Sequence, residues 1–135
     1  MAKEINVVSR ERVERYEGVI IVFNALFREV KELGKKKPEA TLSKTKVNHI
    51  NRVLDDLKFV VDGEPEAKYC EVLESETMPQ FGDAILIMAQ FDGALKAFRG
   101  RHCGSAHGSI HSDWYYEDIF NEDDEGEEED ENNDR

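Results

Sequence analysis

The sequence predicts an all-α protein, an antiparallel helical bundle of three long helices and one short helix with a disordered acidic C-terminal tail. Apolar residues recur at alternating spacings of three and four, the period of a helix with one buried face, and no stretch alternates like a half-buried strand. The net charge of -12 resides entirely in residues 111–135, which hold 13 of the 30 acidic residues and one of the 18 basic ones. A chain of 135 residues has room for one core with appendages.

The first long helix is expected over residues 9–33, where the apolar positions form one continuous face. Further apolar residues widen that face, as expected for a helix with more than one neighbour. Gly34 is expected to end the helix in the left-handed conformation, and Pro38 prevents its continuation. The face consists of Val13, Tyr16, Ile20, Phe23, Phe27 and Val30, widened by Val19, Val22, Leu26 and Leu33.

The second helix is expected to begin after Thr41 or Ser43, since either residue is a suitable N-cap, and to end at Gly63. A short third helix is expected to open with Pro65 and to run through Leu73. The apolar positions are Val47, Ile50, Leu54, Leu57 and Val61 in the second helix and Tyr69, Val72 and Leu73 in the third. Short polar turns between such helices favour an antiparallel bundle.

The last long helix is expected to use Asp83 as its cap and to end near Gly100 and Gly104. Its buried face would contain Phe81, Ala84, Met88, Phe91, Leu95 and Phe98. More than twenty large apolar side chains, each worth roughly 1.5 to 3 kcal/mol when buried, make a monomeric core feasible. Spare apolar residues on the first and last helices leave a homodimer as the alternative.

These elements divide the chain into an N-terminal arm (1–8), the helical bundle (9–102), a linker of Gly, Ser and His (103–112) and an aromatic-acidic tail (113–135). The first residues lack the apolar run of a signal peptide. Cys70 and Cys103 are the only cysteines and have no paired spacing, so reduced thiols are expected. Together these features predict a cytoplasmic protein.

The tail combines aromatic residues with acids, and two interpretations remain open for its aromatic part. It could dock onto the protein's own bundle, or it could bind a partner whose basic rim meets the flanking acids. The candidate partner-binding residues are Trp114, Tyr115, Tyr116, Ile119, Phe120, Asp123 and Asp124. Residues 121–135 contain no residue able to form a core, so we expect them to be disordered when free.

Cys103, His107 and His111 follow the last helix at spacings of four and could ligate zinc. Gly104 and Gly108 argue against a rigid helix that presents these ligands, so a flexible linker is the competing interpretation. Arg101 and His107 could also act near a phosphodiester, but the same glycine breaks the helix between them.

A basic patch follows the first helix and consists of Lys35, Lys36, Lys37, Lys44 and Lys46. It could bind nucleic-acid phosphates, although aromatic residues and arginines are not interleaved with it. The tail could fold back onto this patch and shield it. Phosphate-binding, dinucleotide-binding and zinc-protease motifs are absent from the sequence, which argues against the corresponding enzyme classes.

The sequence therefore predicts a non-enzymatic protein that binds a basic, nucleic-acid-handling protein through its aromatic-acidic tail. Rows of acids can imitate the phosphates of DNA, so occupation of the partner's nucleic-acid site is the expected mode of inhibition. In composition alone, the chain is similar to small acidic helical proteins of phages and plasmids that inhibit host factors. A zinc-binding protein, or a nucleic-acid-binding protein that uses the lysines, are the alternatives.

Overall fold

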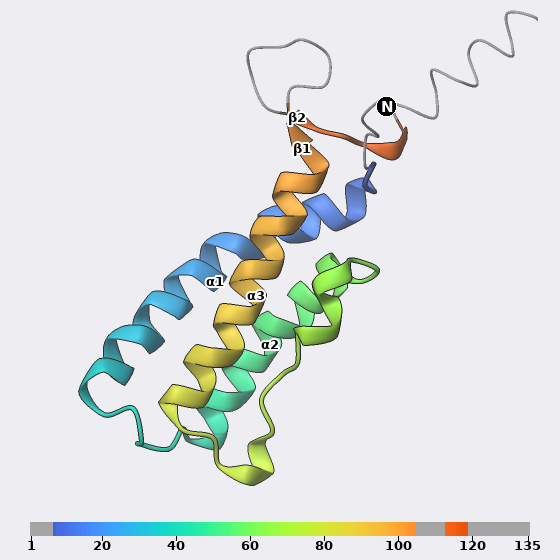
Figure 1. Ribbon diagram of the computed structural model, residues 1–135. Coiled ribbons are helices and arrows are strands. Elements are labelled where there is room, and N and C mark those ends of the chain that lie inside the picture. Colours follow the sequence, from blue (N-terminus) through green and yellow to red (C-terminus); the bar gives the residue numbers. More distant parts are fainter. Residues whose placement is uncertain (1–6, 105–112, 119–135) are drawn as a thin grey trace, which may run out of the picture.

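Three long helices pack together in the computed structural model, which describes residues 7–104 and 113–118 (Figure 1). They are α1 (Arg10–Lys36), α2 (Lys44–Val61) and α3 (Phe81–His102). Two 3-10 helices, η1 (Pro65–Tyr69) and η2 (Ser75–Thr77), lie between α2 and α3, and a short antiparallel pair joins β1 (Cys103–Gly104) to β2 (Asp113–Trp114). The predicted all-α helical bundle is confirmed, while most of the acidic tail lies outside the described residues.

The first helix begins as expected but ends later. The Ser9 side chain accepts a hydrogen bond from the backbone N–H of Arg12, which caps the first turn. Gly34 does not end the helix, and the sequence prediction was wrong here: the residue is buried within the last turns of α1. A Cβ at Gly34 would lie 2.5 Å from Cδ1 of Ile85, so the glycine allows α3 to approach closely.

The cap predicted for the second helix is confirmed, and the cap predicted for the last helix was wrong. Ser43, one of the two candidates, accepts from the backbone N–H of Lys46 and begins α2. Gln80, not Asp83, is the N-cap of α3, and the Asp83 carboxylate accepts from the Gln80 backbone N–H at 2.9 Å in a reciprocal capping box. The expected short third helix is a single 3-10 helix that ends at Tyr69, so Leu73 lies outside any helix.

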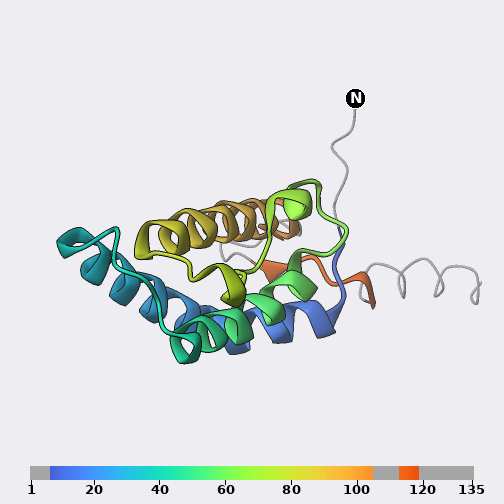
Figure 2. The same cartoon turned by 90° about the horizontal axis from the view of Figure 1, so that it is seen from below.

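The helices α2 and α3 run in the same direction, and both are antiparallel to α1 (Figure 1). At one end of the bundle, Glu64 after α2 reaches Arg12 in α1 and His102 at the end of α3. At the other end, Thr41 before α2 pairs with Gln80 before α3. The connection between α2 and α3 therefore returns along the bundle instead of forming a short turn, as Figure 2 also shows.

One side-chain amide holds this connection in place. The Asn51 amide donates to the Leu73 carbonyl at 2.8 Å and accepts from the Leu73 N–H at 2.9 Å. A buried backbone segment without a partner strand thereby has its polar groups satisfied. Leu73 is buried beside α2 as a result.

The core lies between the three helices and contains most of the predicted apolar positions. Its largest fully buried side chains include Phe23, Phe91, Phe98, Ile50, Leu54, Leu57 and Met88. The widened face of α1 was only partly predicted, because Val22 and Leu33 are exposed, as is Ile21. Within the described ranges, no helix is both long and apolar enough to cross a bilayer.

Candidate functional site

A buried carboxylate joins the three helices at the end of the bundle where α1 begins. The Glu64 side chain is 6% exposed, and three basic side chains from two helices surround it. Arg12 donates to Glu64 at 2.9 Å, His102 Nε2 lies 3.0 Å from the same carboxylate, and Arg101 donates to its second oxygen. Arg12 also donates to the Val60 carbonyl at the end of α2. The cluster thus ties α1, the end of α2 and the end of α3 together.

The charge of Glu64 is stabilised by these donors. Burial raises the pKa of the Glu64 carboxyl, but hydrogen bonds from Arg12, His102 and Arg101 outweigh it, so the pKa lies below its ordinary value of 4.5. Arg101 also forms a two-pronged ion pair with Glu66 at 2.9 and 3.2 Å. Two carboxylates therefore engage Arg101, while His107, its predicted partner near a phosphodiester, lies outside the described residues.

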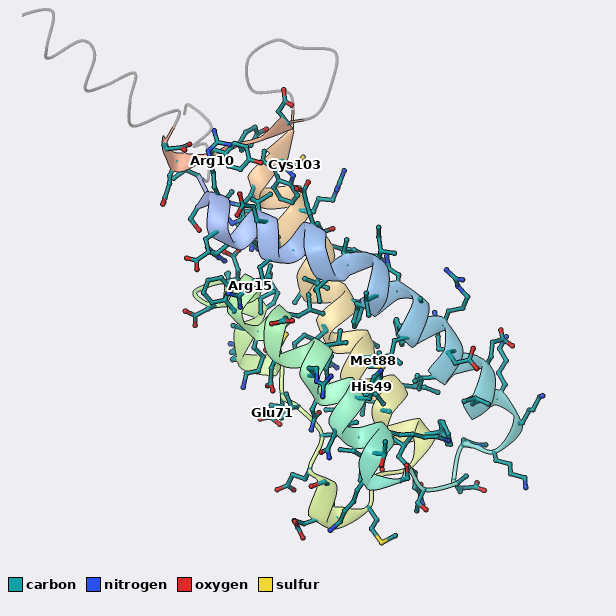
Figure 3. All side chains as sticks on the ribbon, turned by 180° about the vertical axis from the view of Figure 1, so that it is seen from behind. Arg10, Arg15, His49, Glu71, Met88 and Cys103 are labelled. Carbon is teal, nitrogen blue, oxygen red and sulfur yellow. The ribbon has the colours of Figure 1, made fainter. Side chains whose placement is uncertain are left out.

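The segment 113–118 lies against this end of the bundle through backbone hydrogen bonds. Tyr115 N–H donates to the His102 carbonyl at 2.8 Å, and the Val8 N–H donates to the Tyr115 carbonyl at 2.8 Å. Glu117 N–H in turn donates to the Val8 carbonyl at 2.9 Å. Val8, within the expected N-terminal arm, is 1% exposed. The segment is therefore held between the start of α1 and the end of α3, near Arg10 and Cys103 in Figure 3.

Aromatic contacts fix the same segment. The Trp114 ring packs edge-on against Tyr16 at 5.4 Å and lies 5.6 Å from Phe98, while its indole N–H donates to Glu17 at 3.2 Å. The Arg10 guanidinium lies over the Tyr116 ring at 3.9 Å and pairs with Asp118. Gly104 leaves room for the Tyr115 side chain, because a Cβ there would collide with its hydroxyl.

The candidate partner-binding residues thus fall into two groups. Trp114, Tyr115 and Tyr116 are partly buried against the protein's own bundle, the first of the two interpretations that the sequence left open. Ile119, Phe120, Asp123 and Asp124 lie outside the described residues.

The predicted zinc ligands are described only in part. Cys103 is in β1, whereas His107 and His111 lie outside the described residues. Among the residues that the structure does describe, no three His, Cys, Asp or Glu side chains are grouped to hold a metal ion. Zinc binding stays a prediction, which elemental analysis of the untagged protein and of His107→Ala tests: equal metal content in both proteins would contradict it.

The two cysteines are expected to react at different rates. Cys70 is 3% exposed, its thiol donates to the Glu66 carbonyl, and burial, followed by the nearby Glu66 charge, raises its pKa. Since the thiolate is the reacting form, Ellman's reagent should modify partly exposed Cys103 first and Cys70 only as the protein unfolds. Cys103→Ser should remove the fast phase. A fast phase that survives this substitution would contradict the assignment.

The predicted basic patch lies at the opposite end of the bundle from the segment 113–118. Lys35 and Lys36 end α1, Lys37 follows, and Lys44 and Lys46 begin α2; all five residues are exposed. Lys35 lies 3.4 Å from Glu32, and the Lys46 ammonium lies 5.6 Å from the centre of the Phe81 ring. The patch is thus a surface of positive charge with limited internal pairing.

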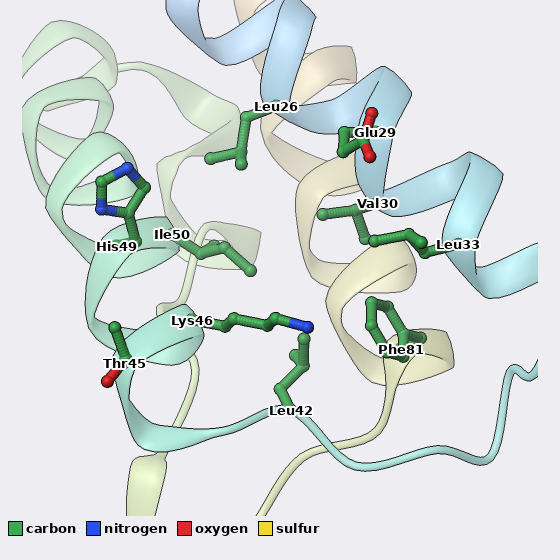
Figure 4. Close-up of a pocket in the computed structure, with 10 residues that line it drawn as sticks. All are labelled: Leu26, Glu29, Val30, Leu33, Leu42, Thr45, Lys46, His49, Ile50 and Phe81. Carbon is green, nitrogen blue, oxygen red and sulfur yellow. The ribbon is translucent and has the colours of Figure 1, made fainter.

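An apolar cleft of about 220 Å³ adjoins this patch between α1 and α2 (Figure 4). Its walls are Leu26, Glu29, Val30 and Leu33 from α1, Thr45, Lys46, His49 and Ile50 from α2, and Leu42 and Phe81. The Lys46 side chain extends across the cleft in Figure 4. The volume is below the range of about 300 to 1,000 Å³ that is typical of small-molecule sites, so the cleft suits a side chain rather than a substrate.

The sequence analysis did not identify the Glu64 cluster. Glu64 stands between Gly63 and Pro65, which reads as an ordinary turn, and its partners lie 37 to 52 residues away along the chain. The sequence does contain the basic residues of the cluster, Arg12 early in α1 and Arg101 and His102 at the end of α3. No local spacing links them to Glu64.

Comparison with known proteins does not identify a relative: no protein-family model matches the chain, and neither a curated protein nor a solved structure is significantly similar to it.

Proposed function

We propose that the protein is a non-enzymatic regulator whose acidic C-terminal residues bind a basic, nucleic-acid-handling protein and occupy its nucleic-acid site. The observation that carries this proposal is the position of the segment 113–118. It is held at the end of the bundle where α1 begins, so the acidic run that follows starts there, at the opposite end from the basic patch.

Distances along the chain support a partner outside the molecule. The 27 residues of α1 separate its two ends by about 40 Å. The acids from Glu122 to Glu125 are at most seven residues beyond Asp118, and an extended chain covers at most about 3.5 Å per residue, or about 25 Å in all. This acidic group therefore cannot reach Lys35 of the same molecule, whereas the acids from Glu127 to Asp134, up to 16 residues beyond Asp118, span up to about 56 Å.

The aromatic residues have divided roles in this proposal. Trp114 and Tyr116 hold the segment to the bundle, so the start of the acidic run has a fixed position on a rigid body. Ile119 and Phe120 would provide the apolar contact with the partner, and Asp123, Asp124 and their neighbours the charge complementarity.

A pull-down from a nuclease-treated lysate tests the proposal. The full chain should retain a basic nucleic-acid-handling protein that moderate salt releases, and a chain ending at Asp118, which keeps the anchored segment, should not retain it. A matched variant with Phe120→Ala, Asp123→Asn and Asp124→Asn should bind more weakly, and excess DNA should compete with the full chain. Equal retention by the full and shortened chains would contradict the proposal.

The exposed lysines support a second candidate function, direct binding of nucleic-acid phosphates at the opposite end. This alternative predicts retention of the chain ending at Asp118 on DNA or RNA, with affinity that falls as salt increases. Replacing Lys35, Lys36 and Lys44 by glutamine should abolish that retention. Failure of the shortened chain to bind either nucleic acid at low salt would exclude it.

A further inference from the structure

The outer side of α1 carries an apolar patch that no described residue covers. The patch consists of Gly18, Ile21, Val22 and Ala25, which follow one another at spacings of three, one and three residues and lie opposite the buried side of the helix. Ile21 is 76% exposed and Val22 is 51% exposed. A Cβ at Gly18 would meet nothing within 4 Å, so the surface there is open. We call these four residues the outer patch.

The outer patch is symmetric about its own midpoint, which is close to the middle of α1. When two such helices pack antiparallel, Gly18 of one meets Ala25 of the other, and at the centre Ile21 meets Ile21 and Val22 meets Val22 of the second copy. The small residues at both ends of the patch let the helices approach, and the larger pair fills the centre. A surface that contacts itself in this way is what a two-fold symmetric dimer requires.

The charges that flank the patch have the same symmetry. Glu14 and Arg15 precede it, and Arg28 and Glu29 follow it, all four with exposed side chains. In the antiparallel pair, Glu14 lies opposite Arg28 of the second copy, and Arg15 opposite Glu29. A parallel pair would instead place each charged residue beside the identical residue of the second copy, and like charges repel. Charge and apolar pattern therefore select the same arrangement.

Arg15 already has a partner within its own molecule, so the pair of Glu14 with Arg28 of the second copy is the stronger evidence. Its guanidinium lies 3.7 Å from Asp56 and 4.3 Å from the centre of the Phe59 ring, and its side chain is still 40% exposed (Figure 3). Arg28 is exposed and lies three residues beyond Ala25 on α1.

We propose that the protein forms a two-fold symmetric homodimer in which the outer patches of two antiparallel α1 helices pack together. One helix from each copy buries an area at or below the lower end for stable complexes, about 1,200 Å² in total. The dimer is therefore in rapid exchange with the monomer and depends on concentration. The acidic tails leave from positions away from the patch and are not needed for it.

Sedimentation equilibrium of the full chain at physiological salt, from low micromolar to near-millimolar concentration, tests the proposal. A monomer–dimer equilibrium is expected. Ile21→Glu should abolish the dimer, because it buries two carboxylates, one from each copy, at the two-fold axis in place of apolar contacts, while the circular dichroism spectrum stays unchanged since Ile21 is exposed. A monomer at every concentration, or a dimer that Ile21→Glu leaves intact, would overturn the proposal.

A charge reversal distinguishes this arrangement from any other dimer. Glu14→Arg and Arg28→Glu should each raise the dimer dissociation constant by about tenfold, because each places like charges opposite one another twice. The double variant restores both pairs and should return the constant to near its original value. Glu76→Arg, in η2 and away from α1, is the matched control and should change nothing. A double variant as weak as the singles would overturn the antiparallel arrangement.

Discussion

Replacing Phe98 with alanine is expected to lower the free energy of unfolding by about 3 to 5 kcal/mol. The Phe98 ring is fully buried and joins the core to the anchored segment: it lies 5.7 Å from the Tyr16 ring, 5.6 Å from Trp114 and 5.0 Å from His102. Truncation leaves a cavity that these rings cannot fill without moving. Denaturant-induced unfolding measures the loss.

Trp114 provides a second measurement on the same variant, since it is the single tryptophan of the chain. Loss of the Phe98 contact should expose its indole to water and shift its emission to longer wavelength under native conditions. Tyr69→Ala is the matched control, because Tyr69 is 58% exposed and should change neither stability nor emission appreciably. An unchanged Trp114 emission in Phe98→Ala would show that the segment does not depend on this ring.

Replacing Glu64 with glutamine is expected to destabilise the protein at neutral pH by about 2 to 4 kcal/mol. Glutamine keeps the shape of the side chain, but it removes the charge that Arg12, Arg101 and His102 share and turns an amide donor toward other donors. The two arginines are partly exposed and recover some hydration, which keeps the loss below that of a fully buried pair. Thermal or chemical unfolding of both proteins measures the difference.

The pH dependence of this difference has a definite sign. The pKa of Glu64 is lower in the folded protein than its ordinary value of 4.5, so its contribution to stability is fully present above pH 4.5 and is lost as the pH falls through the folded value. The wild-type protein and Glu64→Gln should therefore converge in stability below pH 4.5. Glu66→Gln is the matched control: it removes a more exposed partner of Arg101 and should have a much smaller effect. A difference between wild type and Glu64→Gln that stays constant down to low pH would contradict the assignment.

The sequence predicted the helices well because burial imposes a period on each of them. Phe23, Phe27 and Val30 in α1 and Met88, Phe91 and Phe98 in α3 all fall where the spacing of three and four placed them. Val22 and Leu33 were expected to widen the buried face but are exposed. The sequence does not show whether another helix covers an apolar residue at the edge of a buried face. Gly34 was misread for a similar reason: a glycine near a helix end serves both termination and close packing.

Contacts between distant residues could not be read from local patterns. Glu64 acquires its role only when the connection between α2 and α3 brings it to Arg12 and His102, and the direction of that connection is a property of the whole fold. The docking of Trp114 on Tyr16 was one of two interpretations, because aromatic residues beside acids suit an intramolecular anchor and a partner equally. The choice depended on whether the backbone at the end of α3 pairs with the segment, and there the His102 carbonyl accepts from the Tyr115 N–H.

The pairing of Val8 with Tyr115 and Glu117 has a consequence for the order in which the protein folds. Synthesis proceeds from the N-terminus, so α1 and α2 can form while the backbone partners of Val8 have not yet been made. Contacts so far apart along the chain are also the slowest to close. We therefore expect a nascent chain to complete its helices first and to pair Val8 with Tyr115 and Glu117 last. A chain that ends before residue 115 lacks these backbone partners of Val8.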